Sequence, residues 1–488
     1  MDLSIIIPAY NEEKRLPQFL EQVISYCNNS KRKSEIIVVD DGSADKTEAV
    51  VISYAKRFKN LQLVKIDRNH GKGYAVKRGM LKATGELRVF MDADGSVQPD
   101  EIDKNIHYLL KQGYDIFVGS RVLKDKGQTL EVKWYRKLIG KVFNSFVQFF
   151  LFKNISDTQC GFKMFKKDVI VPLFSRIYLN GFGFDIEALY LGHKMGYRII
   201  ESPVSWRHRS GSKINVLTDP IKMFVNILQV RNWHCVPINT SDKYMGPDEY
   251  RYMYNMENYH WWFISHRRLA LSLMNPIRSE SPAILDVGSG TGRTLLSLNK
   301  IGDAHGVDVS DRAVSFCKER GITNVLRSTA EKMDYKDSRF DIVTCLDILE
   351  HVSDPIEVLH ECKRVMRDNG KMVITVPAFA FLWSQHDEAL CHFRRYDKVS
   401  LCADLHESGF KIERLGYFFF ISFLVVAPIR LLRRMVVSGK KPHSDTTTLP
   451  PKILNEFLRF WFTIEIKLLD RIKFPFGTTL FAVVSKKR

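Results

Sequence analysis

Short apolar runs alternate with segments of helical spacing through the first half of the chain. Residues 5–7, 36–39 and 87–91 are runs of strand-forming residues, and helical segments separate them. Such alternation predicts a parallel sheet with right-handed crossovers, whose strands end at one shared edge. Ligands of open α/β sheets bind at that edge, so we expect the loops after these three runs to form a pocket together.

Acidic residues follow two of these runs. Asp40 and Asp41 end the second, and Asp92 and Asp94 follow the third. Two carboxylates one residue apart project from the same side of an extended backbone. Their oxygens suit Mg²⁺ or Mn²⁺ with open positions for a diphosphate. A solvated turn is the alternative for Asp-x-Asp alone.

A glycine-rich stretch lies between the second and third runs. Gly71 and Gly73 allow close approach of the backbone to a ligand, and Lys72 between them can neutralise phosphate. A flexible surface loop would have the same composition, so this stretch supports the pocket only together with the acidic residues.

The second half repeats the alternation. An apolar run at 283–287 leads into Gly288, Gly290 and Gly292, and a second run ends at Asp308, where a carboxylate can take ribose hydroxyls. Further runs at 340–346 and 371–376 continue the pattern, so we expect a second α/β sheet with a nucleoside site. A dinucleotide dehydrogenase is the alternative for the glycines.

The most apolar stretch, 417–434, is shorter than the roughly 20 residues of a spanning helix and is interrupted by Pro428. With the amphipathic segment 457–469 it predicts insertion into a membrane interface. The alternative is a core hairpin that ends in a strand at 478–484. Two further candidates for the interface or the core are 134–152 and 219–229.

The 488 residues carry a net charge of +18, which implies an anionic partner: a phosphorylated lipid, a membrane surface or nucleic acid. The alternative explanation of this charge is a basic surface that only contacts solvent. The sequence contains no reading helix, zinc knuckle or aromatic single-strand platform, so we expect no nucleic-acid partner. Eight cysteines without a Cys-x-x-Cys pair indicate neither a zinc site nor a disulfide framework, and they fit a reducing cytosol. The first eight residues lack the features of a signal peptide.

The first 235 residues resemble the inverting family-2 glycosyltransferases of the GT-A fold, especially the polyprenyl-phosphate (dolichyl-phosphate) glucosyl- and mannosyltransferases. The resemblance rests on eight ordered motifs: Pro8-Ala-Tyr-Asn-Glu12, Asp40-Asp-Gly-Ser43, Gly71-Lys-Gly73, Asp92-Ala-Asp-Gly95, Val118-Gly-Ser-Arg121, Asp157-Thr-Gln-Cys-Gly-Phe-Lys163, Phe184-Asp-Ile-Glu187 and Gly211-Ser-Lys213. It implies a Rossmann-like sheet and a nucleotide-sugar donor. The stretch 157–163 is similar to the glucosyl branch, which uses UDP-glucose.

The resemblance implies roles for individual residues. The residues expected to bind the nucleotide-sugar are Pro8, Tyr10, Glu12, Asp41, Asp92, Arg207 and Lys213. Lys72 joins this set because its charge can neutralise phosphate. Asp92 and Asp94 would hold the metal and serve the diphosphate, which makes Asp94 a catalytic residue. Ser96 stands where the mannosyl branch has a third, Gln ligand.

The chemistry of the acceptor follows from charge. A lipid phosphate, whose second pKa is about 6, attacks as an anion without a strong base, and Arg121, Arg136 and Lys163 are candidates to position it. For a hydroxyl acceptor, Asp185 or Glu187 could act as general base. The stretch 229–233 lacks the Gln-x-x-Arg-Trp spacing of processive synthases, which favours single transfer.

The second half resembles the class I S-adenosylmethionine-dependent methyltransferases. The resemblance implies one binding set: Asp286, Gly288, Gly290 and Gly292 at the methionine end, Asp308 at the ribose and Glu331 at the adenine. Asp347, Glu350 and His351 extend it toward ubiquinone-type O-methyltransferases, in which Glu-x-x-Glu-His binds a divalent ion. Asp347 replaces the first Glu, so His351 is either a metal ligand, a general base or a residue that shapes the pocket.

We therefore expect a bifunctional, peripheral enzyme on the cytoplasmic face of a membrane. Its parts would be a glycosyltransferase (1–235), a linker (236–255), a methyltransferase (256–415) and a membrane-surface tail with a final strand (416–488). It would transfer a sugar to a polyprenyl phosphate and methylate an oxygen of a lipid-linked sugar or related lipid. The alternatives are a hydroxyl acceptor in cell-surface polysaccharide synthesis with an unrelated quinone-type methyltransferase, and a basic binding scaffold.

Overall fold

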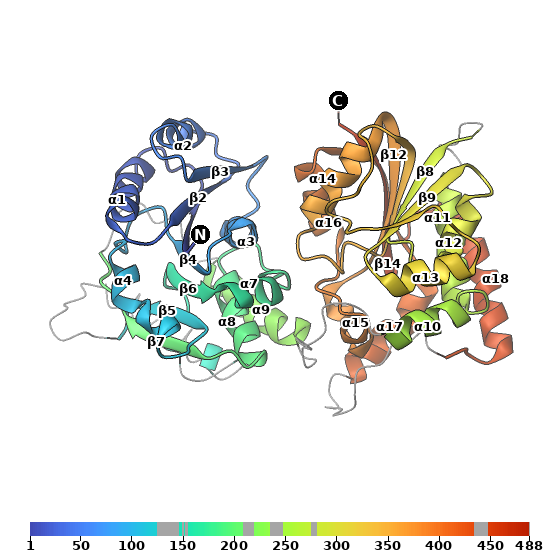
Figure 1. Cartoon of the computed structure of the whole chain (residues 1–488). Coiled ribbons are helices and arrows are strands. Elements are labelled where there is room, and N and C mark those ends of the chain that lie inside the picture. The colour runs from blue at the N-terminus through green and yellow to red at the C-terminus, as the bar shows by residue number, and fades with distance from the viewer. Residues whose placement is uncertain are drawn as a thin grey trace. The chain divides into compact units, whose positions relative to one another are not determined.

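The computed structural model describes residues 1–123, 146–148, 151, 155–207, 219–234, 247–274, 281–433 and 448–487. The chain divides into two compact units, Met1–Ile238 and Asn239–Arg488. Each unit is built on its own sheet of seven strands with helices on both faces (Figure 1). Within the described ranges, no helix has both the length and the apolar character needed to cross a bilayer.

The sheet of the first unit has the order β3-β2-β1-β4-β6-β5-β7. Its strands are β1 (Leu3–Ala9), β2 (Ser34–Asp41), β3 (Leu61–Ile66), β4 (Leu87–Met91), β5 (Ile116–Ser120), β6 (Phe162–Lys166) and β7 (Ile199–Pro203). β1 pairs in parallel with β2 and β4, whereas β6 runs antiparallel to β4 and β5. The carboxyl ends of β1, β2 and β4 therefore share the edge at which the loops were expected.

Two hydrophobic cores cover the two faces of this sheet. Its helices are α1 (Leu16–Asn29), α2 (Thr47–Ala55), α3 (Lys72–Lys82), α4 (Glu101–Asn105), α5 (His107–Leu110), α7 (Lys167–Phe174), α8 (Phe184–Lys194) and α9 (Asp219–Trp233). Ile6 belongs to the core beneath α3, α7 and α8, while Ile5 and Ile7 belong to the core beneath α1. The strand is apolar without interruption because both of its faces are buried.

The sheet of the second unit has the order β10-β9-β8-β11-β12-β14-β13. Its strands are β8 (Ala283–Val287), β9 (Asp303–Asp308), β10 (Val325–Arg327), β11 (Phe340–Leu346), β12 (Met366–Pro377), β13 (Phe410–Phe418) and β14 (Thr479–Lys486). β14 is antiparallel to both of its neighbours, and the strands from β10 to β12 are parallel. The expected fold class, two Rossmann-like α/β sheets, is confirmed.

Helices also cover both faces of the second sheet. They are α10 (Pro247–Met256), α11 (Trp261–Met274), α12 (Arg293–Leu298), α13 (Asp311–Glu319), α14 (Pro355–Val365), α15 (Gln385–Ala389), α16 (Lys398–Glu407), α17 (Phe420–Arg433) and α18 (Lys452–Leu468), with a short 3₁₀ helix at Ala380–Leu382. α14 and α16 pack on one face, and α11, α12 and α18 pack on the other (Figure 1).

The segment 416–488 differs from the separate tail that the sequence predicted. β14 fills the gap between β12 and β13, so this part of the chain completes the sheet. α18 packs against α11, where the ring centroids of Trp261 and Phe462 are 5.2 Å apart and the Asn455 side chain accepts a hydrogen bond from the Trp261 amide. The apolar pattern of the segment thus serves the core as well as the surface.

Candidate active sites

The loop after β4 presents two partly exposed carboxylates, those of Asp92 and Asp94. The Asp92 amide donates to the carbonyl of Gly161 at 3.1 Å, and the Gly95 amide closes the turn onto the Asp92 carbonyl at 3.2 Å. Gly95 has φ +66°, which a side chain would strain. The Ser96 amide then donates to Asp94 at 2.9 Å. The loop is therefore held by its own backbone, which leaves the carboxylates at the strand end.

Gly161 and Lys72 enclose the Asp92 carboxylate. A Cβ at Gly161 would fall 2.0 Å from Asp92 Oδ2, so no larger residue fits there without moving the carboxylate. Lys72 Nζ lies 2.6 Å from Asp92 Oδ1. Burial lowers the pKa of Lys72, but the nearby carboxylates of Asp92 and Asp185 outweigh it and raise that pKa. Lys72 therefore carries its charge at the point where a donor diphosphate would meet these acids.

The stretch around Lys72 is an ordered helix start, not a flexible loop. Lys72 begins α3, and Gly71 before it has φ +108° and lies against the carbonyl of Asn180. A Cβ at Gly73 would meet the carbonyl of Leu179 at 2.5 Å. Both glycines are needed because this backbone packs against the segment at 179–180, and that packing fixes Lys72.

The donor set at Asp92 and Asp94 fits a divalent cation. Both side chains offer hard oxygens, and both are partly exposed, which leaves room for a substrate oxygen on the same ion. Such an ion would stabilise the charge that develops on a departing diphosphate. In the chain, Lys72 and Arg15 contribute positive charge beside the same acids.

Two residues predicted to hold the nucleotide also organise the loops. Asp41 accepts hydrogen bonds from the amides of His70 and Gly71 at 2.9 and 2.8 Å. Glu12 is nearly buried and forms a two-pronged ion pair with Arg15. Tyr10 is 37% exposed beyond β1, and Pro8 lies within that strand. The edge formed by β1 and β2 is thus pre-organised around Asp41 and Glu12.

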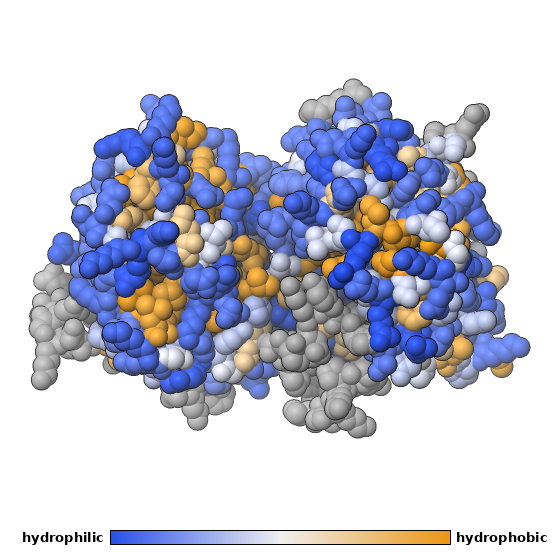
Figure 2. Space-filling view, viewed as in Figure 1, coloured by the Kyte–Doolittle hydropathy of each residue, from blue (hydrophilic) through white to orange (hydrophobic). Residues whose placement is uncertain are grey.

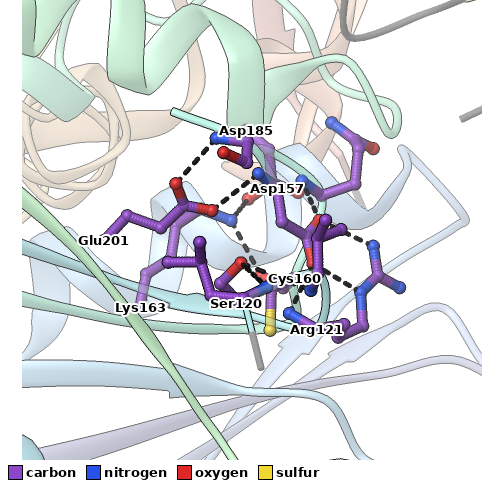
Figure 3. A network of polar contacts seen from close by, with 11 residues as sticks. Ser120, Arg121, Asp157, Cys160, Lys163, Asp185 and Glu201 are labelled. Atoms are coloured by element: carbon purple, nitrogen blue, oxygen red, sulfur yellow. Dashed lines mark hydrogen bonds and ion pairs between the residues drawn. The ribbon is translucent and has the colours of Figure 1, made fainter. Parts of the chain in front are cut away.

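A polar network links the ends of β5, β6 and β7 (Figure 3). The Arg121 guanidinium donates to both carboxylate oxygens of Asp157, each at 2.8 Å. Glu201 in turn accepts from the backbone amides of Ser156 and Asp157 at 2.7 and 2.8 Å. Burial raises the pKa of Asp157, but the guanidinium of Arg121 outweighs this and lowers it. Arg121 is thereby held rigidly while 35% of its side chain stays exposed.

Lys163 is wholly buried, which corrects the prediction that it binds a lipid phosphate. Its Nζ lies 2.5 Å from Asp185 Oδ1 and donates to the carbonyl of Cys160 at 2.8 Å (Figure 3). Burial also raises the pKa of the Cys160 thiol to about 12. An acceptor phosphate cannot reach Lys163 here, so its role is to neutralise Asp185 inside the unit.

Asp185 and Glu187 do not match the prediction of a general base. Asp185 is 2% exposed and paired with Lys163, and burial raises its pKa. Glu187 is fully buried and accepts from the amides of Tyr178 and Leu179 and from the ring of His234. Both carboxylates are therefore engaged by other groups of the first unit.

Arg207, a predicted cation for the diphosphate, follows β7 in an exposed position. Its amide donates to the Ser96 carbonyl at 2.9 Å, which places it beside the loop of Asp94, and its side chain is exposed. Two other predicted cations, Lys213 and Arg136, fall outside the residues that the structure describes.

The second unit presents its glycine loop after β8. Gly288, Gly290 and Gly292 all have positive φ, at +74°, +53° and +85°. Asp308 at the end of β9 accepts from the amides of Gly290 and Ser310, both at 2.9 Å. It therefore ties the loop to the neighbouring strand, as a nucleoside site at this edge requires.

Asp286 and Glu331 flank that loop. Asp286 is 2% exposed and accepts a hydrogen bond from the Thr344 hydroxyl at 2.6 Å. Burial raises the pKa of Asp286 to about 7. Glu331 is partly exposed beyond β10, in the turn bridged by Thr329 and Lys332. The predicted binding residues thus gather on the β8, β9 and β10 side of the sheet.

The sequence did not single out Glu257, which covers the same loop from the start of the unit. Its carboxylate accepts from Thr291 Oγ1 at 2.7 Å and pairs with Arg320, and burial raises its pKa to about 7. Arg320 also lies 4.1 Å from the ring centre of Tyr254. Local sequence does not indicate this role, because the contacts with Thr291 and Arg320 join distant segments.

His351 lies beyond β11 beside Glu350 and His392. Burial and the neighbouring His392 hold the pKa of His351 well below its usual range. The imidazole is therefore neutral at physiological pH.

Comparison with known proteins agrees with both folds. The glycosyl transferase family 2 profile matches residues 4–174, and a methyltransferase domain profile matches residues 285–374. The dolichyl-phosphate β-glucosyltransferase of Dictyostelium discoideum is 36% identical over 240 residues, covering 47% of this chain and 73% of that protein. The human protein of that name is 31% identical over 246 residues, covering 47% and 74%. A solved S-adenosylmethionine-dependent methyltransferase of Thermotoga maritima, 19% identical with a TM-score of 0.32, covers 49% of this chain and 96% of its own.

Both resemblances seen in the sequence are confirmed, and the alternatives of a dehydrogenase and of a binding scaffold are set aside. The chain belongs to glycosyltransferase family 2 through its first unit, with relatives among the dolichyl-phosphate β-glucosyltransferases, and it is a bifunctional enzyme whose second unit is a methyltransferase.

Proposed function

We propose that the first unit transfers glucose from UDP-glucose to a polyprenyl phosphate, with Mg²⁺ or Mn²⁺ at Asp92 and Asp94. The observation that carries this is the set of cations around these acids. Lys72 contacts Asp92, and Arg207 lies beside the Asp94 loop. The negative charge of Asp92 also contributes to the raised pKa of Arg121. One anion, the donor diphosphate, and a second, the acceptor phosphate, can both be neutralised there.

The burial of the other two acids favours a phosphate over a hydroxyl acceptor. Asp185 and Glu187, the candidate bases, are engaged with Lys163 and with backbone amides. A phosphate needs no base because it is already an anion near neutral pH, with a second pKa of about 6. The activity named for the relatives, dolichyl-phosphate β-glucosyltransferase, supports this acceptor and glucose as the sugar.

We propose that the enzyme is a peripheral protein on the cytoplasmic face of a membrane. On α18, Ile453, Phe457 and Phe460 are 87%, 52% and 66% exposed. On α17, Leu424 and Val425 are half exposed. Apolar atoms interrupt the hydrophilic surface in Figure 2 where Figure 1 places α18. Exposed apolar helix faces on a chain of net charge +18 suit an anionic bilayer surface.

For the second unit we propose transfer of a methyl group from S-adenosylmethionine to an oxygen of a lipid-linked sugar or a related lipid. Asp308 and the glycine loop would hold the donor. Tethering two sites on one chain raises the effective concentration of one product at the other site, which helps when both act on the same lipid.

A mass-spectrometric survey of products tests both activities. The full chain is incubated with vesicles containing polyprenyl phosphate, UDP-glucose, S-adenosylmethionine and Mn²⁺. We expect glucosyl and methyl groups on the lipid fraction, loss of glucosyl transfer in Asp94→Asn, and loss of methyl transfer alone in Asp286→Ala. Glucose on a hydroxyl acceptor only, or methyl groups only on a soluble phenol or quinone precursor, would contradict the respective proposal.

A further inference from the structure

The loop after β11 carries a buried carboxylate, that of Glu350. Glu350 is 1% exposed, and neither of its carboxylate oxygens has a hydrogen-bond partner among the residues that the structure describes. Leaving a buried carboxyl unsatisfied is costly, so such a group calls for a ligand. Its position supplies one clue: Ile348, two residues earlier, lies against Gly288, which places this loop next to the proposed methyl-donor site.

Two imidazoles converge on this carboxylate. One ligand atom from each of Glu350, His351 and His392 lies within 4.8 Å of the other two. The rings of His351 and His392 meet edge to face, with centroids 4.6 Å apart. Of the three residues, His351 is partly exposed, so the cluster opens toward solvent or substrate on that side.

Each imidazole is oriented through a further oxygen. His392 Nδ1 lies 3.0 Å from Asp387 Oδ1, and Asp387 is itself fixed by two contacts with Arg395. The ring of His351 donates a hydrogen bond to the backbone carbonyl of Leu390. Histidines that ligate metals are typically held in this way, by a carboxylate or a backbone carbonyl at the other ring nitrogen. The supporting groups of a metal site are thus already in place.

Asp347 occupies the position of the first Glu in the Glu-x-x-Glu-His pattern, and it is engaged elsewhere. Its carboxylate lies 3.1 Å from His266 Nε2 and accepts from the Thr375 hydroxyl at 3.2 Å. His392, 41 residues beyond His351 in sequence numbering, takes the vacant role from a separate loop. The ligand set is therefore one carboxylate and two imidazoles instead of two carboxylates and one imidazole.

We propose that Glu350, His351 and His392 bind one divalent transition-metal ion, with Zn²⁺ as the expected metal. Two imidazoles and one carboxylate suit Zn²⁺ and its neighbours better than Mg²⁺, which prefers oxygen ligands. Three protein ligands leave an open position, and a bound ion would lower the pKa of an acceptor hydroxyl there. The proposal requires only metal binding and does not depend on the glucosyl acceptor.

Cobalt spectroscopy separates this site from the one at Asp92 and Asp94. Co²⁺ with two imidazole ligands and few ligands in total absorbs visible light strongly, whereas Co²⁺ in a six-coordinate oxygen site absorbs weakly. The full chain with Asp92→Asn and Asp94→Asn is stripped of metal and titrated with Co²⁺ and then with Zn²⁺. We expect one strongly absorbing equivalent, displaced by Zn²⁺ and retained in excess Mg²⁺.

Variants in the same background assign the ligands. Glu350→Gln and His392→Asn should each abolish the Co²⁺ band, and Asp387→Asn should weaken Co²⁺ binding about 10- to 100-fold. Asp347→Asn and the control His305→Asn, a histidine outside this cluster, should keep the full equivalent. Calorimetric binding of S-adenosylmethionine checks that each variant is folded. The proposal would be overturned if the Co²⁺ band were absent before these changes. It would also be overturned if the band persisted in Glu350→Gln and His392→Asn, or if it were lost in Asp347→Asn.

Discussion

Gly161 lies so close to Asp92 that a Cβ on Gly161 would fall 2.0 Å from the carboxylate oxygen Oδ2. The contact joins the start of β6 to the end of β4, because the Asp92 amide also donates to the Gly161 carbonyl. A motif 69 positions away from Asp92 in the sequence numbering thus sets where the Asp92 carboxylate can lie. This packing explains why the loop after β4 and the segment before β6 lie side by side in the first unit.

Gly161→Ala should lower the rate of sugar transfer about 100-fold, because a displacement of a catalytic group by about 1 Å can cost that much. The added methyl group meets a side-chain carboxylate, which can rotate, so we expect the fold to persist. Steady-state transfer and a thermal melt measure the two effects. Gly181→Ala is the matched control, since a Cβ there meets no described atom within 4 Å. Equal activity of the two variants would show that the Asp92 position tolerates the shift.

The pair Lys163–Asp185 should behave as a buried ion pair. Lys163→Met and Asp185→Asn each leave one charge buried without its partner and should destabilise the first unit by about 3–5 kcal/mol. The double change Lys163→Met with Asp185→Leu should cost less than the sum of the two. Calorimetric unfolding of the full chain measures this difference. The transition of the first unit is identified because added UDP should raise its melting temperature.

A control on the surface sharpens that comparison. Lys65 and Glu48 form an exposed pair at 2.7 Å, and exposed pairs contribute about 1 kcal/mol or less. Lys65→Met should therefore leave the melting temperature almost unchanged. If Lys163→Met melted as Lys65→Met does, the interior would have to admit water to the Asp185 carboxylate.

The sequence predicted the ends of the strands better than the environment of the side chains behind them. The Asp92 and Asp94 loop follows β4 as expected, since a strand period and a turn are local properties. The burial of Lys163 was not predicted, because its partner Asp185 lies on another element 22 residues later. A charged residue within a strand normally indicates an exposed face, and only the tertiary structure shows otherwise.

The same limit explains the C-terminal segment. Its apolar residues predicted either an interface or a core, and local pattern cannot separate these. The pairing of β14 with both β12 and β13 brings residues more than 60 positions apart into register, as Phe481 opposite Gly416 shows. Likewise His392 joins Glu350 only because two loops meet at one sheet edge.

Binding of S-adenosylmethionine should weaken below pH 7. Burial raises the pKa of Asp286 to about 7, so between the ordinary value near 4 and pH 7 the folded unit binds a proton that the unfolded chain does not. The stability of the ligand-free unit contributed by this group is therefore full at low pH and is lost as pH rises toward 7. The cationic ligand prefers the ionised carboxylate, so the dissociation constant should rise up to tenfold from pH 7 to pH 6.

Calorimetric titration at pH 6, 7 and 8 measures this dependence. Asp286→Asn should bind S-adenosylmethionine weakly at all three pH values. Its dissociation constant should also lack the part of the pH dependence that Asp286 causes. Glu257, whose pKa is also about 7, is tested by Glu257→Gln, which should keep that contribution. A pH-independent dissociation constant in the unaltered protein would mean that Asp286 is ionised throughout this range.

Exposed apolar residues on α18 should drive binding to anionic vesicles. Ile453 and Phe460 are 87% and 66% exposed, and burying an Ile or Phe side chain fully contributes about 1.5–3 kcal/mol. The double change Ile453→Ser with Phe460→Ser should therefore lower vesicle partitioning at least about tenfold while leaving the melting temperature unchanged. Cosedimentation with vesicles that contain anionic lipid measures it. Val399→Ser is the matched control, because Val399 is 75% exposed on α16, away from the proposed contact surface. High salt should weaken binding of all forms alike, since it screens the charge contribution and not the apolar one. If the double variant bound as the control does, insertion by α18 would be ruled out and the basic charge alone would account for membrane binding.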